Sequence, residues 1–287
     1  MYLSVIIPAY NAEKTIGEQL DALKKQSWDG EWEVIIADNG SNDNTVNFAL
    51  QYKQDLPGLR IVSANKKKGA PYARNAGAQE AKGDAFLFID ADDVVSDSWL
   101  QTLGGALREN QMVASRFEQN KLNSPDVLKI MKSPQLDGLN KFRFSDFLPF
   151  AGACGLGVRR EVHEKIGGFD EALIAGEDID YCWRAQLQGV ELSYIPDAVV
   201  HIRLRGEVKG VFRQYIRNGE YSIPIYKKYR DKGMQYDGIK AGLYRWYLLM
   251  RRFIKIRSRH DYTVWLKEFG YRFGILKGCL KYRVMAL

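Results

Sequence analysis

The chain has 287 residues, 46% of them hydrophobic and 12% aromatic, which is enough to build a sizeable core and excludes a disordered or fibrous protein. The net charge of +7 is uneven, because residues 1–202 carry −8 and residues 203–287 carry +15. The three cysteines are scattered and show no Cys-x-x-Cys spacing, so neither a disulfide framework nor a zinc site is indicated, and a reducing cytosol fits best. The N-terminus lacks the features of a signal peptide and no long apolar run occurs, so we expect neither secretion nor a membrane-spanning helix.

The first ninety residues alternate between strand and helix patterns. The β-branched run at 3–10 predicts a strand, Asn11 stands where an N-cap would, and Ile16, Leu20 and Leu23 form the stripe of an amphipathic helix. This alternation predicts a mostly parallel sheet with helices on both faces. The other predicted elements here are strands at 32–38, 59–64 and 85–90 and helices at 45–53 and 70–81.

Three polar or acidic clusters follow predicted strands, at 8–11, 38–43 and 90–93. In open α/β sheets, ligands bind beyond the carboxyl ends of the strands, so these clusters mark a predicted site. The cluster at 38–43 is rich in turn-forming residues. Its alternative interpretation is a strand-to-helix loop in which Asp43 or Asn44 caps the next helix.

The stretch Asp-Ala-Asp-Asp at 90–93 places three carboxylates within four residues. Such carboxylates repel one another, and a hard divalent cation such as Mg²⁺ or Mn²⁺ is the usual relief. Asp90 and Asp92 project to one side of an extended chain while Asp93 leaves on the other, so one pair can face a site. The alternative is a loop whose acids favour the N-terminus of the next predicted helix, 98–107.

A second acidic pair, Glu177 and Asp178, opens a predicted helix that begins after Gly176. In the alternative interpretation, these acids only complement the helix dipole, and Asp180 forms an ordinary ion pair with Arg184 four residues on. The predicted buried face of this helix consists of Ile179, Trp183 and Leu187.

Together the motifs resemble those of the family 2 glycosyltransferases, over about residues 3–205. The fold that this resemblance implies is α/β of the GT-A type, with a Rossmann-like, mostly parallel central sheet and flanking helices. Beyond it, this chain has a basic, aromatic-rich helical C-terminal extension. The matching motifs, in the order of the family, are VIIPAYN, IIADNGSNDNT, KGAPYARNAG, FIDADD, GGFDEALIAGEDIDYCWR and IPDAVVH.

The resemblance implies a nucleotide-sugar donor site in the first half of this region. It makes Asp38 the partner of the nucleotide base, and it places Arg74 beside the nucleotide as a fixed positive charge or as an anchor of the loop. Asn39 departs from the pattern, because many relatives have a second Asp there. The resemblance adds to the base pocket Pro8, Ala9 and Tyr10.

The same resemblance implies a divalent metal, Mn²⁺ or Mg²⁺, held against the donor diphosphate. Asp92 would coordinate the metal, while Asp90, with Ala91 beside it, would contact the ribose or a metal-bound water. His201 aligns with a position that completes the metal shell in some relatives, and a neutral imidazole suits Mn²⁺. The alternative for His201 is a structural hydrogen bond at a strand end.

Catalysis would use the second acidic pair. The resemblance makes Asp178 the base for the incoming hydroxyl, with Glu177 as a neighbour that raises its pKa or binds the acceptor. A single in-line displacement inverts the anomeric configuration. Trp183 and Arg184 echo an acceptor-side motif of processive relatives, but the Gln-x-x-Arg-Trp order of that motif is missing, which favours a non-processive enzyme.

These inferences predict an inverting, metal-dependent transferase that moves a sugar from a nucleotide sugar to a glycan or lipid-linked acceptor during cell-surface polysaccharide or glycolipid synthesis. We expect the nucleotide to be UDP. The alternative is a sugar-nucleotide-binding module that has lost catalysis. The predicted domains are a catalytic domain at 1–205, with a donor half at 1–116 and an acceptor half at 117–205, and an extension at 206–287.

The extension mixes aromatic and basic residues from 238 to 283. Leu243, Tyr247, Met250 and Ile254 form an apolar stripe at helical spacing. One interpretation is an appendage that packs on the catalytic domain or in a homodimer. Another is an interfacial helix that holds a cytoplasmic protein on the inner face of an anionic membrane. Nucleic-acid binding has no supporting motif, so we expect no such partner. The basic flanks of the stripe are Arg245, Arg251, Arg252 and Lys255.

Overall fold

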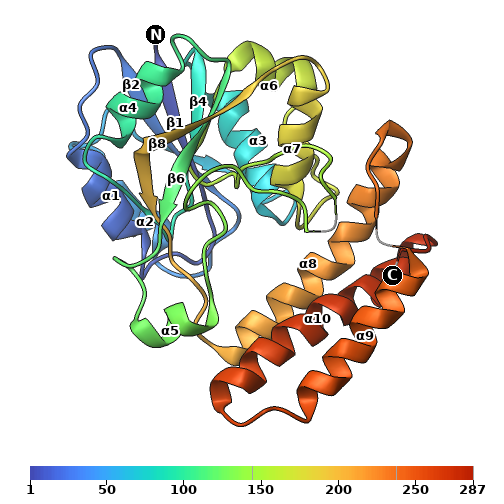
Figure 1. The fold of residues 1–287 in the computed structure, drawn as a ribbon. Coiled ribbons are helices and arrows are strands. Elements are labelled where there is room, and N and C mark those ends of the chain that lie inside the picture. Colours follow the sequence, from blue (N-terminus) through green and yellow to red (C-terminus); the bar gives the residue numbers. More distant parts are fainter. Residues whose placement is uncertain (144, 237, 287) are drawn as a thin grey trace. The chain divides into compact units, whose positions relative to one another are not determined.

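The computed structural model describes residues 1–287 except 144, 237 and 287. The chain forms two compact units, one α/β and one helical (Figure 1). The first unit comprises residues 1–122, 133–140 and 150–203, and the second comprises residues 123–132, 141–149 and 204–287.

An eight-stranded sheet forms the centre of the first unit, with the strand order β3-β2-β1-β4-β7-β6-β8-β5. From β3 to β4 neighbouring strands are parallel, whereas β7 is antiparallel to both β4 and β6, and β5 is antiparallel to β8. The predicted α/β fold is confirmed, with a sheet that is mixed. The strands are β1 (Leu3–Ala9), β2 (Trp32–Asp38), β3 (Arg60–Ser63), β4 (Ala85–Phe88), β5 (Val94–Val95), β6 (Met112–Glu118), β7 (Leu156–Arg159) and β8 (Leu192–His201).

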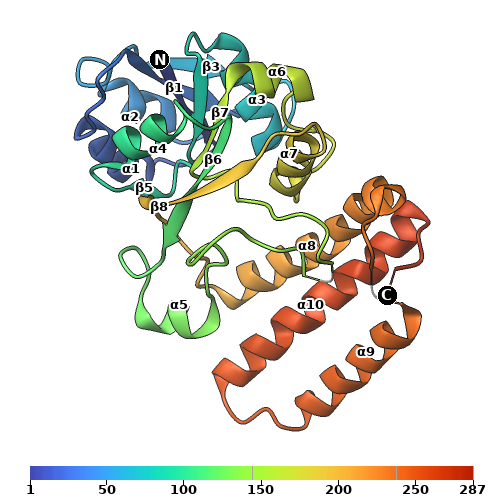
Figure 2. The same ribbon diagram turned by 45° about the horizontal axis from the view of Figure 1, so that its top comes forward.

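Helices flank this sheet, as Figures 1 and 2 show. Two of the helices lie beside the site described below. They are α3, on the parallel half of the sheet, and α7, which follows the loop after α6. The helices of the first unit are α1 (Ile16–Lys24), α2 (Thr45–Leu50), α3 (Ala70–Glu80), α4 (Trp99–Ala106), α6 (Arg160–Ile166) and α7 (Glu177–Gln186).

Close packing of α3 against the sheet depends on Gly77. A Cβ atom at this position would lie 2.6 Å from Cγ2 of Ile6 in β1, which is closer than side chains approach one another. Ile6 and its neighbour Ile35 in β2 are fully buried in the core. The missing side chain at Gly77 therefore lets α3 lie directly on the parallel strands, with Arg74 one turn earlier in the same helix.

Two local predictions are wrong. Asn11 does not cap a helix, because α1 begins only at Ile16, after Thr15. Asn11 instead has a left-handed backbone with φ of 50°, and its side-chain oxygen accepts a hydrogen bond from the N–H of Asn42 at 2.8 Å. Leu187, predicted on a buried face, is 44% exposed, because it stands at the C-cap of α7, where the helix ends.

The second unit is a helical assembly in which α8 and α10 pack together along their lengths (Figure 1). A Cβ at Gly219 of α8 would lie 2.0 Å from the backbone oxygen of Tyr271, and one at Gly274 of α10 would lie 2.1 Å from that of Ile216. Glycines thus allow a backbone-to-backbone approach. The helices here are α5 (Pro125–Ile130), α8 (Val208–Tyr229), α9 (Ile239–Phe253) and α10 (Arg259–Tyr282), with the 3₁₀ helix η1 (Arg230–Lys232).

Charged side chains add to the α8–α10 contact. Glu220 of α8 is buried, and its two carboxylate oxygens lie 2.7 and 2.8 Å from the ammonium groups of Lys277 and Lys281 in α10. Both lysines are about half exposed, so their charges remain hydrated while they neutralise the buried carboxylate. Among the described helices of both units, none is long and apolar enough to cross a bilayer.

Candidate functional site

The site lies where β1, β2 and β4 end. These strands are parallel neighbours, so their carboxyl ends meet at one edge, with Ala9 in register with Asp38. The Asp38 carboxylate accepts hydrogen bonds from the backbone N–H groups of Gly40 and Ser41 at 3.2 Å each. It thereby closes the turn that follows β2. The predicted role of Asp38 as the base partner stays a prediction.

Asn39 holds a second loop at this edge. Its side-chain oxygen accepts a hydrogen bond from the N–H of Gly69 at 2.8 Å, and its side-chain NH₂ donates to the backbone oxygens of Ala64 and Lys67. An aspartate would keep the acceptor and lose both donors. Asn39, which replaces the aspartate of many relatives, therefore fixes the segment that leads into α3.

A cavity of about 370 Å³ opens over these loops. Its walls include the ends of β1 and β4 and the start of α3. Of the residues predicted to bind the donor, seven line it: Pro8, Ala9, Tyr10, Arg74, Asp90, Ala91 and Asp92. Tyr10 is 52% exposed, so its ring is available for stacking. Asp38 does not line this cavity in the described chain, although its neighbour Asn39 does.

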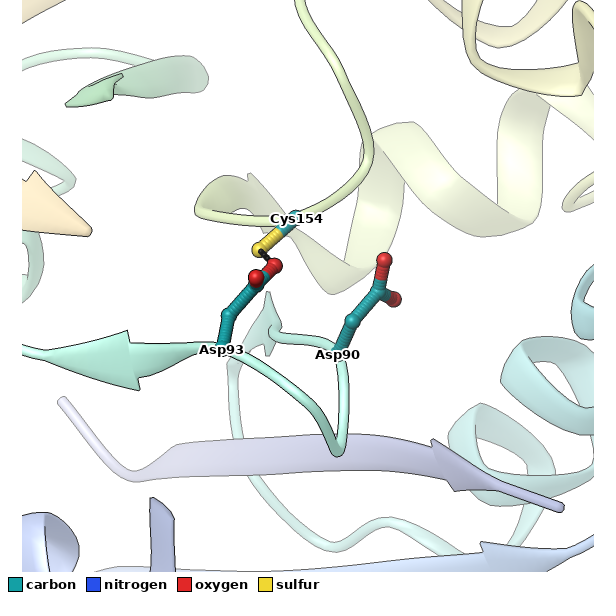
Figure 3. A group of neighbouring side chains, drawn as sticks. All are labelled: Asp90, Asp93 and Cys154. Carbon is teal, nitrogen blue, oxygen red and sulfur yellow. Dashed lines mark hydrogen bonds between the residues drawn. The ribbon is translucent and has the colours of Figure 1, made fainter. Parts of the chain in front are cut away.

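The three carboxylates after β4 have different surroundings. Asp92 is exposed, Asp90 is partly buried, and Asp93 is buried. Cys154 donates its S–H to one oxygen of Asp93 at 2.8 Å, and the backbone N–H of Arg203 donates to the other at 2.7 Å. Figure 3 shows the Cys154 thiol and the Asp93 carboxylate pointing toward each other, with Asp90 beside them.

Burial raises the pKa of Asp93 well above its usual value, and the negative charges of Asp92 and Asp90 raise it further. Asp90, Asp93 and Cys154 offer ligand atoms within 4.8 Å of one another. A thiol that donates to a carboxylate is a poor ligand for a hard cation, however, and Asp93 is already used by two donors. We therefore regard Asp93 and Cys154 as a packed support beneath the loop.

Arg74 supplies a positive charge to these carboxylates. It is 3% exposed, and its guanidinium lies 2.8 Å from Asp90 and 3.1 Å from Glu177. It also lies over the ring of Phe169, 5.4 Å from the centroid. The buried positive charge of Arg74 is compensated by these two carboxylates, and the two ion pairs tie the end of β4 to the start of α7.

A second cavity, of about 280 Å³, adjoins the first. It shares four residues with the first cavity and adds the acidic pair of α7, together with Phe117 and the segment Gly152–Cys154. A Cβ at Gly152 would lie 3.0 Å from the ring of Phe117 and 4.0 Å from an Asp178 oxygen, so the glycine lets this segment pack closely against Phe117 beside that carboxylate. The four shared residues are Arg74, Asp90, Asp92 and Arg203.

Asp178 has the electrostatics of a base. Burial raises the pKa of its carboxyl to about 7, and the neighbouring charge of Glu177 contributes in the same direction. A hydrogen bond from the N–H of Ile179 at 2.8 Å and the charge of Arg74 act in the opposite direction. A carboxylate with a pKa near neutrality is matched to proton abstraction at physiological pH.

Trp183 and Arg184, predicted on the acceptor side, are packing residues in the structure. Trp183 is fully buried with 0% exposure. The Arg184 guanidinium lies 2.7 Å from Asp180 and donates to the backbone oxygens of Ile166 and Gly168. Neither side chain is among the described residues that line the two cavities. These contacts fix α7 against the segment that follows α6.

His201 stands at the end of β8, where its ring Nδ1 lies 2.7 Å from the carboxylate of Glu118. In metal sites, a carboxylate on one ring nitrogen commonly orients the other toward the metal. His201 does not line either of the two cavities in the described part of the chain. Its place in a metal shell stays a prediction.

The sequence patterns did not reveal Arg203. This residue lines both cavities, donates from its side chain to the backbone oxygen of Asp92 at 3.0 Å, and lies 3.0 Å from Glu18. The signal in the sequence that could have identified Arg203 is its position as a basic residue just beyond the strand that ends at His201. Its relation to Asp92 depends on the pairing of β8 with β5, which joins positions about a hundred residues apart.

The residues present fit a hard divalent cation. The exposed Asp92 and the partly buried Asp90 lie where the two cavities join, and carboxylate oxygens are the ligands that Mg²⁺ and Mn²⁺ prefer. Arg74 and Arg203 lie beside them, so the junction presents positive and negative groups together. An anionic diphosphate with its metal is a suitable ligand for such a junction.

Comparisons with known proteins agree with this geometry. The family model described as "Glycosyl transferase family 2" matches residues 4–167. Glycosyltransferase AglE of Haloferax volcanii is 28% identical over 206 residues, which are 69% of this chain and 66% of AglE. Poly(ribitol-phosphate) beta-N-acetylglucosaminyltransferase TarS of Staphylococcus aureus is 26% identical over 75% of this chain and 38% of its own length. The chain thus spans less than two thirds of the length of these relatives.

Solved structures show the same fold. The crystal structure of S. aureus TarS 1–349 in complex with UDP-GlcNAc superposes with a TM-score of 0.56, at 17% identity, and covers 99% of this chain and 93% of that one. Mannosyltransferase PcManGT from Pyrobaculum calidifontis, in complex with GDP-Man and Mn²⁺, gives a TM-score of 0.61 at 18% identity, covering 99% and 76%. At these identities the likeness establishes the GT-A fold.

Proposed function

Because the chain belongs to glycosyl transferase family 2, we propose that it transfers a sugar from a nucleotide sugar to an acceptor hydroxyl, with inversion at the anomeric carbon. The observation that carries this proposal is the junction of two cavities at Arg74, Asp90, Asp92 and Arg203. One cavity is lined by residues predicted to bind the nucleotide, and the other contains a carboxylate whose pKa is raised to about 7. A sugar at the junction would have its leaving group in one cavity and its attacker in the other.

The donor occupies the first cavity. We assign the base and ribose to the side lined by Pro8, Ala9 and Tyr10, with Asp38 at the end of β2. The diphosphate lies near Arg74, where a buried guanidinium is held in a fixed position. We propose UDP as the nucleotide, which is the one bound in the TarS structure, whereas PcManGT was solved with GDP-Man.

A divalent metal, Mn²⁺ or Mg²⁺, belongs to this proposal, and PcManGT was solved with Mn²⁺. Asp92 is its proposed ligand, and His201 a second one through the ring nitrogen that Glu118 does not contact. When bound, the metal would neutralise charge on the departing diphosphate. Asp90 would keep its contact with Arg74 and so hold the loop in place.

Asp178 acts as the general base. The acceptor oxygen forms a bond to the anomeric carbon while the bond from that carbon to the diphosphate oxygen breaks, and the hydroxyl proton passes to the Asp178 carboxylate. The nucleoside diphosphate leaves with the electron pair of the broken bond. Glu177 remains bound to Arg74, so its charge raises the proton affinity of Asp178 without competing for the proton.

The acceptor is a glycan or lipid-linked hydroxyl in cell-surface polysaccharide or glycolipid synthesis, and transfer is non-processive. TarS, whose name gives poly(ribitol-phosphate) as the acceptor, is one relative of this kind. In this proposal residues 1–116 form the donor half, residues 117–205 the acceptor half, and residues 206–287 an extension. The extension holds the protein on the cytoplasmic face of a membrane through the exposed apolar stripe of α9.

The test is nucleotide release from a panel of UDP-, GDP- and dTDP-sugars by the full chain, with and without Mn²⁺. We expect one UDP-sugar to be turned over in the presence of metal and to be inert after chelation. A matched Asp178→Asn chain should bind that donor and release almost no nucleotide. Donor binding without turnover by either chain would instead support a sugar-nucleotide-binding module without catalysis.

A further inference from the structure

Gln135 is fully buried, with 0% exposure, in a segment that joins two parts of the first unit. Its backbone oxygen accepts a hydrogen bond from the N–H of Phe117 in β6 at 2.9 Å. Further along, Asn140 forms an isolated antiparallel bridge with Phe150, in which each N–H donates to the backbone oxygen of the other, at 2.8 and 2.9 Å. The segment 133–140 therefore connects β6 with the chain that leads into β7.

The side-chain amide of Gln135 makes hydrogen bonds at both of its ends. Its oxygen accepts one from the N–H of Gly152 and one from the side-chain NH₂ of Asn140, both at 2.9 Å. Its own NH₂ group donates to the backbone oxygen of Ser115 in β6 at 2.8 Å. Because a backbone N–H can only donate, the contact with Gly152 fixes which end of the amide is the oxygen. A buried amide with partners at both ends is held in one orientation, and it holds its partners in place.

Gly152 is the point at which this network reaches the site. It lines the second cavity, as Phe117 does. A Cβ at Gly152 would lie 3.0 Å from the ring of Phe117 and 4.0 Å from an oxygen of Asp178, so Gly152 packs on Phe117 beside the proposed base. Gln135 holds both sides of this contact, Phe117 through its backbone oxygen and Gly152 through its side chain.

Other buried side chains fix the residues on either side of Gly152. The N–H of Ala151 donates to the sulfur of Cys182 in α7 at 3.5 Å, and that thiol lies 3.6 Å from the backbone oxygen of Ala151. Cys154 donates to Asp93 at 2.8 Å, the contact drawn in Figure 3. The wall segment, residues 151–154, is thus attached to α7 at one end and to the loop after β4 at the other. The hydrogen bond at Gly152 attaches its middle to the segment 133–140.

We propose that Gln135 is a positioning residue of the proposed transferase reaction, which holds Gly152 and so fixes the wall of the second cavity beside Asp178. This inference rests on the proposed function, in which the attacking hydroxyl enters that cavity. A reacting oxygen must lie about 3–3.5 Å from the carbon that it attacks, and a displacement of about 1 Å can lower the rate by about 10²-fold. A wall that is hydrogen-bonded in one position limits such displacement. Gln135 therefore contributes to turnover although it lines neither cavity in the described part of the chain.

The experiment measures nucleotide release by the full chain and its variants, using the UDP-sugar that the wild-type chain turns over. Gln135→Met keeps the length of the side chain and removes the partner of the Gly152 N–H. We expect its kcat to fall by about tenfold or more, since the wall loses its fixed position. The donor KM should stay within about twofold, because Gly152 and Phe117 line the second cavity and not the first. A wild-type kcat, or a loss confined to the donor KM, would overturn the proposal.

Gln135→Glu is the conservative variant. We expect a carboxyl group buried there to stay protonated, because burial raises the pKa of an acid. The protonated carboxyl has an acceptor oxygen for Gly152 and an O–H donor for the backbone oxygen of Ser115, so it can reproduce the contacts of the amide. The kcat of Gln135→Glu should therefore lie within about threefold of the wild-type value. A loss as large as that in Gln135→Met would overturn the proposal, because this variant keeps the hydrogen bond to Gly152.

Gln26 provides a matched control for the loss of side-chain hydrogen bonds. Its side chain also holds backbone groups, since it donates to the oxygens of Ala22 and Ser96 at 3.0 and 2.9 Å and accepts from the N–H of Leu100 at 2.9 Å. Gln26 is not among the described residues that line the two cavities. Gln26→Met should therefore lower the free energy of unfolding, as Gln135→Met should, and leave kcat unchanged. Similar losses of kcat in both variants would mean that general destabilisation is responsible, and would overturn the proposal.

Hydrogen exchange of the backbone amides gives a readout that does not depend on activity. The N–H of Gly152 is protected by its bond to Gln135, so peptides that cover residues 150–154 should exchange faster in Gln135→Met and at the wild-type rate in Gln26→Met. Unchanged exchange in Gln135→Met would overturn the inference even where the transferase activity is found. If instead the wild-type chain releases no nucleotide from any donor, the proposed function fails. Faster exchange in Gln135→Met alone would then still support the role of Gln135 in holding this wall.

Discussion

At the scale of single residues, Arg74 is the group on which the two halves of the site converge. Its guanidinium contacts Asp90 after β4 and Glu177 at the start of α7, and it lies over Phe169. The carboxylate predicted as the base is one residue beyond Glu177. The pKa of Asp178 therefore depends in part on the charge of a residue that also lines the proposed donor cavity.

The first prediction concerns the pH dependence of turnover. Asp178 must be ionised to accept a proton, and its pKa is raised to about 7, so kcat/KM should fall as the pH falls below about 7. Glu177→Gln removes a negative charge that raises this pKa and should move the acidic limb to lower pH. The measurement is kcat/KM from pH 5 to 9 for both chains. If the acidic limb of the pH profile of kcat/KM stays at the same pH in Glu177→Gln, a group other than Asp178 controls it.

The second prediction separates two arrangements of the metal. Asp92→Asn should lower Mn²⁺-dependent donor binding by about tenfold or more, because it removes an exposed anionic ligand. Asp93→Asn is the matched control, since it makes the same change one residue on and keeps an acceptor for the N–H of Arg203. Donor affinity at varied Mn²⁺ gives the readout. If Asp93→Asn lowers Mn²⁺-dependent donor binding and Asp92→Asn does not, the cation would instead be bound by Asp90, Asp93 and Cys154.

At the scale of helices and strands, the elements that could be predicted are those whose apolar residues repeat at the spacing of a helix or form the run of a buried strand. The strands β1, β2 and β4 are apolar runs in the sequence because both faces of a parallel sheet are buried. The polar and acidic residues at their ends could therefore be predicted to lie at one edge of the sheet. The pairing of β5 with β8 has no local pattern, which is why Arg203 was missed. Asn11 resembled a cap, but its side chain is used by the loop at Asn42, a contact that depends on the tertiary fold.

The third prediction tests the close contact of α3 with the sheet. Gly77→Ala places a Cβ 2.6 Å from Ile6, so it should lower the free energy of unfolding by about 1–3 kcal/mol and raise the donor KM by displacing Arg74. Gly105→Ala in α4 is the control, because nothing lies within 4 Å of its added Cβ. That change should be neutral or stabilising by about 0.5–1 kcal/mol. Chemical denaturation and donor titration would measure both effects.

At the scale of the whole molecule, charge is segregated along the chain: residues 1–202 carry −8 and residues 203–287 carry +15. The apolar stripe predicted from the sequence is exposed in the structure, with Leu243, Tyr247, Met250 and Ile254 between 50% and 80% exposed. Basic residues beside an exposed apolar stripe are the features by which a helix lies on an anionic membrane surface.

The fourth prediction is that the full chain binds anionic vesicles reversibly and dissociates from them at high salt concentration. Raising the ionic strength from 0.1 to 1 M shortens the Debye length from about 10 Å to about 3 Å, so co-sedimentation should fall steeply. Met250→Ser with Ile254→Ser should weaken binding at both salt concentrations, because it removes exposed apolar area without changing charge. Equal recovery of the chain with neutral and anionic vesicles would argue against this attachment.

The glycine contacts between α8 and α10 have a consequence for engineering. Gly219 and Gly274 admit no larger residue without separating the backbones of α8 and α10, so these two positions should not tolerate substitution. The outer face of α9 is the reverse case, because its large side chains are exposed to solvent. Libraries of variants confined to that face should therefore keep the fold, so α9 is a place to introduce a new binding surface without redesigning the protein.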